Sequence, residues 1–179
     1  MKWMKTMALA GATLALAGAA GAQDVTTDFD KAANFAGIKT FSLKIGTAWG
    51  NPIGEKRVTD EITQGLTEKG WTLAEEGKAD SQVVLHGATQ TKHSLNTFYS
   101  GMGGYGYRGF GGMGTATTTD SEYLVGTLVV DIFDAKSKAL LWRGTAQDEL
   151  SDKPDKNVKK LAKASDKLFK DFPPGSKKK

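Results

Sequence analysis

The stretch that decides the fold is EYLVGTLVVDIFDAKSKALLWRGTAQDE, residues 122–149, which predicts two β-strands around a tight polar turn. In residues 124–133, both alternating sets of side chains are largely apolar. Because side chains alternate across a strand, this pattern predicts a central strand that is covered on both faces. The DAKSK segment, residues 134–138, has the charge and the turn-forming residues of a short hairpin loop. Residues 140–147 then return as the second strand of an antiparallel pair.

Hydrophobic spacing predicts the remaining elements outward from this hairpin. Alternating and helical periods place strands at residues 25–29, 39–45, 71–74 and 81–91, and helices at residues 55–69 and 155–172. Gly70 is positioned to end the first helix, and Pro154 suits the first turn of the second. On the return strand, we expect Trp142 in the core and Arg143 beside a carboxylate or at the sheet rim.

The order of these elements predicts an α+β fold. We expect one mostly antiparallel sheet of about five or six strands, with two helices packed on one face. Residues 23–172 are long enough for a single domain with its own core, and residues 173–179 form a disordered basic tail. Charge is uneven, since residues 23–150 hold 12 basic and 16 acidic side chains whereas residues 151–179 hold 10 lysines and 4 aspartates. Because the basic excess belongs to the last segment, a nucleic-acid-binding surface is not expected.

The N-terminus has the pattern of a secretory signal peptide. Lys2 and Lys5 precede an apolar run at residues 7–19, and Ala20-Gly21-Ala22 supplies small residues for cleavage after Ala22. The apolar run is short for a membrane span. The chain contains no cysteine, so it has neither a lipid-attachment site nor a disulfide. We therefore expect residues 1–22 to be removed from a periplasmic protein, with a secreted location left open.

Residues 96–114, NTFYSGMGGYGYRGFGGMG, are rich in glycine and aromatic residues. They match G-x-G-x-x-G repeatedly, but a dinucleotide site requires a helix after the glycines and here a strand follows. We expect a loop at about residues 96–116 between two strands. It is either a floppy spacer or an adaptable surface for a partner, a glycan or a membrane headgroup. The candidate partner-binding residues are Tyr105, Tyr107, Arg108 and Phe110.

No residue pattern indicates catalysis, a metal or a cofactor. His86 and His93 are seven residues apart, which places them on opposite faces of a continuous strand. Asp131 and Asp134 likewise fall on opposite faces, and Asp134 is a natural turn residue. Nucleophile motifs such as G-x-S-x-G and S-x-x-K do not occur.

The hairpin also resembles a known bacterial family, the domain of unknown function 4136. The resemblance lies in GTLVVD at residues 126–131, DAK at 134–136 and LWRGTA at 141–146. It continues upstream, in the order that the family shows, at residues 25–30, 35–41, 66–71 and 79–84. It covers residues 24–150 and implies an α+β fold and an envelope location, but it supplies no functional residues. Many relatives are lipoproteins, a pattern from which this cysteine-free chain departs.

Three functional hypotheses follow from the sequence. The first is a non-enzymatic binding or accessory module of the cell envelope that uses the glycine/aromatic loop on an envelope protein or component. The second is a peripheral membrane protein that makes weak contact with anionic lipids through the lysines of the last helix, Lys156, Lys160, Lys163, Lys167 and Lys170. The third is a hydrolase or transferase with an unrecognised site. We expect the first, without enzymatic activity or a cofactor.

Overall fold

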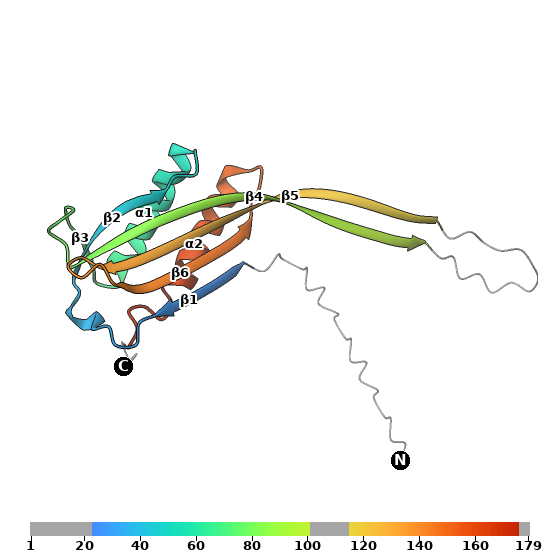
Figure 1. Cartoon of the computed structure of the whole chain (residues 1–179). Helices are drawn as coiled ribbons and strands as arrows, with labels where there is room; N and C mark the ends of the chain where they lie inside the picture. The colour runs from blue at the N-terminus through green and yellow to red at the C-terminus, as the bar shows by residue number, and fades with distance from the viewer. Residues whose placement is uncertain (1–22, 101–114, 176–179) are drawn as a thin grey trace, which may run out of the picture.

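The computed structural model describes residues 23–100 and 115–175 and consists of one six-stranded sheet with two α-helices (Figure 1). The elements along the chain are β1 (Asp24–Phe29), the 3-10 helix η1 (Phe35–Gly37), β2 (Thr40–Thr47), α1 (Pro52–Glu68), β3 (Thr72–Leu73), β4 (Ser81–Ser100), β5 (Thr115–Asp134), β6 (Leu140–Glu149) and α2 (Pro154–Leu168). The strand order is β1-β6-β5-β4-β2-β3. The predicted α+β class is confirmed. The sheet is mixed, because β2 runs parallel to both β3 and β4 while the other pairs are antiparallel.

Local signals in the sequence set the ends of the helices. The side chain of Asn51 caps α1 by accepting a hydrogen bond from the Gly54 N–H at 3.1 Å, so the helix begins three residues before the predicted start. Gly70 has a φ of 86°, the left-handed conformation that ends a helix and that favours glycine. Helix α2 begins at Pro154, one residue before the predicted start, and ends at Leu168, four residues before the predicted end.

The core lies between the sheet and the helices, which cover the same face (Figure 1). The two helices run parallel and approach closely near their C-terminal ends, where a Cβ on Gly65 would lie 2.8 Å from atoms of Ser165 and Phe169. Below that contact, Trp142 stacks on Phe169 at a centroid distance of 5.7 Å. The predicted core position of Trp142 is confirmed, since only 2% of its surface is exposed.

Within residues 23–100 and 115–175, the opposite face of the sheet carries no α-helix, which corrects the expectation that β5 is covered on both sides. Val130 and Ile132 point toward the helices and are fully buried, whereas Val129 and Phe133 on the other face are only half-buried. The reason is that the apolar stripes of both helices join one core, so neither described helix covers the second face. We refer to this second surface as the open face.

Asp80 joins the start of β4 to the start of β2. Its Oδ2 accepts hydrogen bonds from the N–H groups of Lys39 and Thr40, both at 3.0 Å, and from the Thr40 hydroxyl at 2.9 Å. The Lys39 hydrogen bond is the largest cause that holds the pKa of Asp80 below its usual range, followed by the two bonds from Thr40.

The hydrogen bonds to Asp80 predict that the stability of the domain depends on pH. Because the pKa of Asp80 is lower in the folded than in the unfolded chain, its contribution is complete above the unfolded value, about pH 4, and is lost as the pH falls through the folded value. The melting temperature of wild type should therefore be higher than that of Asp80→Ala near neutral pH, and the difference should shrink as the pH falls into the acid range. Asp60→Ala, which removes only an exposed pair with Lys56, should show a small gap at neutral pH. A gap for Asp80→Ala that persists unchanged to pH 2 would contradict the assignment.

Candidate functional site

A two-stranded arm projects from the domain (Figure 1). Strands β4 and β5 pair along all twenty residues, to Ser100 opposite Thr115. Their outer neighbours stop earlier, since β2 pairs with β4 only as far as His86, and β6 pairs with β5 only from Val125. Beyond those points, we call the remaining ribbon the β-arm.

The β-arm alters the predicted loop. Backbone pairing continues through Ser100 and resumes at Thr115, so the strands take up several residues of the loop expected at about 96–116. The glycine/aromatic tract connects the two strands at the end of the β-arm. The candidate residues within it, Tyr105, Tyr107, Arg108 and Phe110, lie outside the described residues, as do the predicted signal peptide and residues 176–179.

Most residues at 87–94 and 118–124 of the β-arm are polar. His93 lies across from two carboxylates, with its Nδ1 3.6 Å from Asp120 Oδ1 and 3.7 Å from Glu122 Oε1. These side chains are more than half exposed. Within residues 87–100 and 115–124, no third strand pairs with either outer edge. Such an edge is a template for an additional strand.

A cleft opens between the N-terminal halves of the two helices. The helices touch at Gly65 and Ser165 and diverge from there toward Pro52 and Pro154, which leaves a space of about 350 Å³ above the sheet. We call this space the interhelical cleft. Its apolar walls and floor include Trp49, Val58, Leu128, Ala146, Val158 and Leu161. Spaces of this size hold small molecules in proteins.

Two glycines shape the floor of the interhelical cleft. The Trp49 ring lies directly on Gly87, where an added Cβ would come within 1.9 Å of the ring. Leu150 packs on Gly126 in the same way, at 2.9 Å. The Trp49 N–H donates to Glu55 Oε1 at 3.0 Å, which fixes the backbone of this tryptophan to the first turn of α1. These two side chains, which come from loops, therefore complete the cleft.

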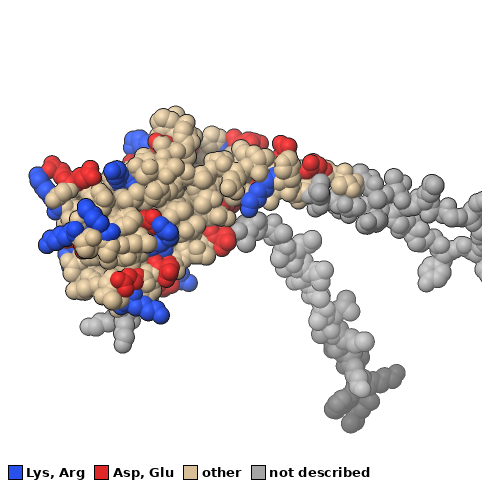
Figure 2. Space-filling view, viewed as in Figure 1, with Lys and Arg blue, Asp and Glu red and all other residues tan. Residues whose placement is uncertain are grey.

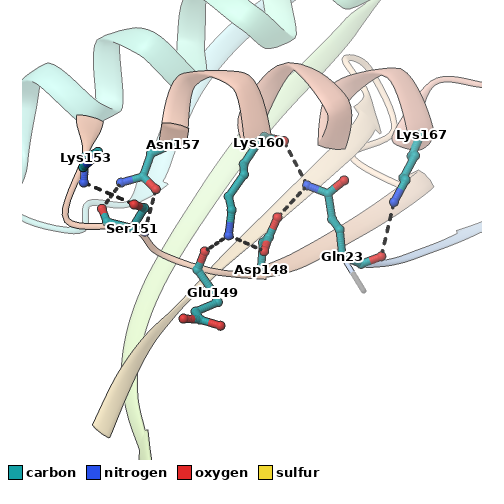
Figure 3. Close-up of polar contacts among 8 residues, drawn as sticks. All are labelled: Gln23, Asp148, Glu149, Ser151, Lys153, Asn157, Lys160 and Lys167. Carbon is teal, nitrogen blue, oxygen red and sulfur yellow. Dashed lines mark hydrogen bonds and ion pairs between the residues drawn. The ribbon is translucent and has the colours of Figure 1, made fainter. Parts of the chain in front are cut away.

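Polar contacts between β6 and α2 close one rim of the interhelical cleft (Figure 3). Lys160 Nζ lies 3.0 Å from Asp148 Oδ1 and donates to the Glu149 carbonyl. Gln23 donates from Nε2 to Asp148 Oδ2 at 3.2 Å and to the Lys160 carbonyl at 2.9 Å. Both oxygens of the Asp148 carboxylate therefore have a hydrogen-bonding partner.

The lysines of α2 do not form one free face, which corrects the sequence-based placement. Lys160 reaches to β6, and Lys167 Nζ donates to the Gln23 carbonyl at 3.5 Å (Figure 3). Both lysines thus hold the helix to the strand edge, because their long stems extend back over the sheet. Lys156, Lys163, Lys167 and Lys170 are exposed, and Lys160 is half-buried.

The loop into α2 is held by paired amide contacts (Figure 3). Asn157 Oδ1 accepts from the Ser151 N–H at 2.8 Å, and Asn157 Nδ2 donates to the Ser151 carbonyl at 2.7 Å. Lys153 precedes the helix without a side-chain cap. The first N–H groups of α2 beside the cleft are therefore not satisfied by a capping side chain.

The open face carries a row of polar contacts across β6, β5, β4 and β2. Arg143 donates from Nε and Nη2 to the two carboxylate oxygens of Asp131, at 2.6 and 2.7 Å. This hydrogen-bonded carboxylate raises the pKa of Arg143. His86 Nε2 lies 3.9 Å from Asp131, and His86 Nδ1 lies 2.9 Å from the Thr47 hydroxyl. Every member has a partner, and the predicted pairing of Arg143 with a carboxylate is confirmed.

The structure separates the two carboxylates that might have formed an acid–base pair. Asp131 pairs with Arg143, whereas Asp134 folds over the β5–β6 turn and accepts from the N–H and hydroxyl of Ser137. The Ser137 N–H is the largest cause of the lowered pKa of Asp134. In residues 23–100 and 115–175, no group of three or more His, Asp or Glu side chains is arranged to hold a metal ion.

Acidic and basic side chains are mixed over the surface seen in Figure 2, and neither sign dominates this view. Among the described residues, no helix has the length and apolar character needed to cross a membrane.

Similar folds occur in solved bacterial structures. A PDZ domain protein from Parabacteroides distasonis is 15% identical with a TM-score of 0.53, and the match covers 87% of this chain but only 37% of that one. A DUF4136 family protein from Bacteroides thetaiotaomicron is 17% identical with a TM-score of 0.52, covering 84% of this chain and 96% of the other. No curated protein matches the sequence.

The chain is thus an α+β domain in which a mixed sheet carries two helices on one face, and its fold is similar to that of the DUF4136 family protein. The sequence profile of DUF4136, a domain of unknown function, matches residues 25–174. The chain belongs to this family.

Proposed function

We propose that this chain is a non-enzymatic binding or accessory protein of the bacterial cell envelope. It contacts an envelope protein or component through the β-arm and the glycine/aromatic tract at its end. The observation that carries the proposal is the length of the β-arm. The β4–β5 pair continues well past His86 in β4 and Val125 in β5, the last residues that pair with an outer strand. A two-stranded ribbon gains little stability by itself, so its persistence favours a role outside the domain.

The test replaces Gly101–Gly114 with an Asn-Gly turn and, separately, changes Tyr105, Tyr107 and Phe110 together to serine. Both variants should keep the melting temperature within a few degrees, because loop length enters stability only logarithmically. Both should lose cross-links to the partner in whole cells, read by mass spectrometry. Lys78→Ser, on the exposed turn before β4, serves as the surface control. Unchanged cross-links in the two variants would reduce the tract to a spacer, and a large fall in melting temperature would show that its aromatic residues stabilise the domain.

We place the protein in the periplasm after cleavage behind Ala22. Gln23, the residue directly after this boundary, donates hydrogen bonds to Asp148 and to the Lys160 carbonyl, which supports a domain that includes this residue. The intact mass of the exported protein should correspond to residues 23–179. Retention of residues 1–22 would contradict both the cleavage and the location.

The two other hypotheses gain less support. The membrane hypothesis is weakened because Lys160 and Lys167 are engaged with β6 and Gln23. For a hydrolase or transferase, the ionisable groups with shifted pKa values among the described residues are Glu61, Asp80, Asp134 and Arg143. None of these four lines the interhelical cleft, where a substrate would enter.

A further inference from the structure

The interhelical cleft is built as a binding site for an apolar chain. Its floor consists of small or aliphatic residues from three strands, Gly87, Leu128 and Ala146. Its walls are Val58 from α1 and Val158 from α2. Val158 belongs to the apolar stripe of its helix, yet 42% of its surface is exposed. An apolar side chain in a concave surface gains free energy when a ligand covers it.

The size of the cleft decides how many chains fit. A volume of about 350 Å³ lies at the small end of the range for ligand sites. This volume suits one hydrocarbon chain rather than a lipid with two.

The charge around the cleft decides the head group. Three charged side chains line it, of which Asp148 and Lys160 neutralise each other at 3.0 Å. The third is Arg57, and no described carboxylate lies within ion-pair distance of it. The N-terminal turns of α1 and α2 line the same cleft, but each carries an acidic residue, Glu55 and Asp155, that offsets the positive end of its helix. Among the side chains that line the cleft, the unpaired charge is therefore that of Arg57, and a guanidinium pairs well with a carboxylate.

We infer that the interhelical cleft binds a single-chain carboxylate amphiphile, a free fatty acid. The hydrocarbon chain lies between Val58 and Val158 over the sheet, against the Trp49 ring. The carboxylate lies at Arg57. This site lies at the base of the β-arm, where Gly87 forms part of its floor, and it does not require the partner proposed for the β-arm and the glycine/aromatic tract.

The experiment titrates the exported protein with dodecanoate below its micelle concentration, by calorimetry. We expect saturable binding with one site per chain. Dodecyltrimethylammonium, with the same chain and a cationic head, and acetate, with the same head and no chain, should bind at least tenfold more weakly. Equal binding of the cationic amphiphile would overturn the choice of head group, and equal binding of acetate would overturn the role of the chain.

Matched variants place the ligand. Arg57→Gln should weaken dodecanoate binding about five- to tenfold, the size of one partly exposed ion pair. Lys56→Gln removes the same charge from the next residue of α1, which is exposed and does not line the cleft, and should change binding less than twofold. Val158→Trp fills the cleft from an exposed wall position and should abolish binding while the melting temperature is kept. Equal effects of the two charge variants, or full binding by folded Val158→Trp, would exclude the cleft.

Trp49 supplies a direct readout of contact. A chain-brominated dodecanoate should quench the fluorescence of wild type, because bromine quenches a tryptophan that it touches. The quenching should be largely absent in Trp49→Phe, since Trp71 and Trp142 are buried in the core with 3% and 2% exposure. Quenching that persists in Trp49→Phe would place the chain elsewhere.

Discussion

Val130→Asp is expected to unfold the domain or to lower its stability by more than about 4 kcal/mol, which corresponds to a fall in melting temperature of more than ~8 °C. Val130 has no exposed surface and lies under the helices in the C-terminal half of β5. The substitution places a carboxylate there without a partner, and burying an unpaired charge is among the costliest changes in a protein core. Thermal melts and far-UV circular dichroism measure the effect.

The next residue provides the matched control. Val129→Asp puts the same carboxylate one position away on the open face, where the side chain is half-buried and water reaches it. It should cost much less, and Lys138→Ala in the β5–β6 turn should change stability by less than about 0.5 kcal/mol. Lys138 has a φ of 60°, and alanine bears the same conformational cost as lysine there. Similar losses for Val129→Asp and Val130→Asp would mean that both faces of β5 are covered after all.

Arg143→Met is the second large expected effect. It removes both hydrogen bonds to Asp131, whose side chain is only 3% exposed, and leaves a buried carboxylate with His86 at 3.9 Å as its nearest ionisable neighbour. We expect a loss of about 2–4 kcal/mol in the free energy of unfolding at pH 7. Lys44→Met, an exposed cation on the open face of β2, should change stability little. Denaturant melts of both variants measure the difference.

The double variant separates two explanations of such a loss. If the cost comes from the unpaired carboxylate, Asp131→Leu combined with Arg143→Met should restore stability to within about 1 kcal/mol of wild type. Asp131→Leu alone should cost less than Arg143→Met alone, because the Arg143 side chain is 52% exposed and remains hydrated. A double variant as unstable as the sum of the single variants would indicate that packing, rather than charge, explains the effect.

Particular residues show which parts of the fold can be predicted from the sequence. The β5–β6 hairpin, the glycine stop at Gly70 and the core position of Trp142 follow from alternation and from local backbone preferences. The extent of the β-arm was not predicted, because Ser100 and Thr115 border a glycine-rich tract whose composition is typical of a loop. Pairing between two strands, rather than the propensity of either strand, continues the ladder there.

The interhelical cleft was missed for a different reason. Val58 and Val158 fall on the apolar stripes of their helices, and periodicity assigns both to the core. Their spacing shows which side of the helix faces inward, but it contains no information on how far apart the two helices lie. The small residues Gly87 and Gly126 were the available signal, since glycine inside a strand marks a close approach of another group.

The amino-acid sequence was sufficient for the α+β class, the family, the β5–β6 hairpin and the glycine stop of α1, because these depend on alternation, helical period and backbone preferences within short segments. The folded arrangement was needed to learn which sheet face is covered, where Lys160 and Lys167 reach, and that the two helices diverge above Leu128. These features depend on how elements distant in the chain pack together. The distance between α1 and α2 is set by Gly65 against Ser165 and Phe169, a contact across a hundred residues that no local pattern encodes.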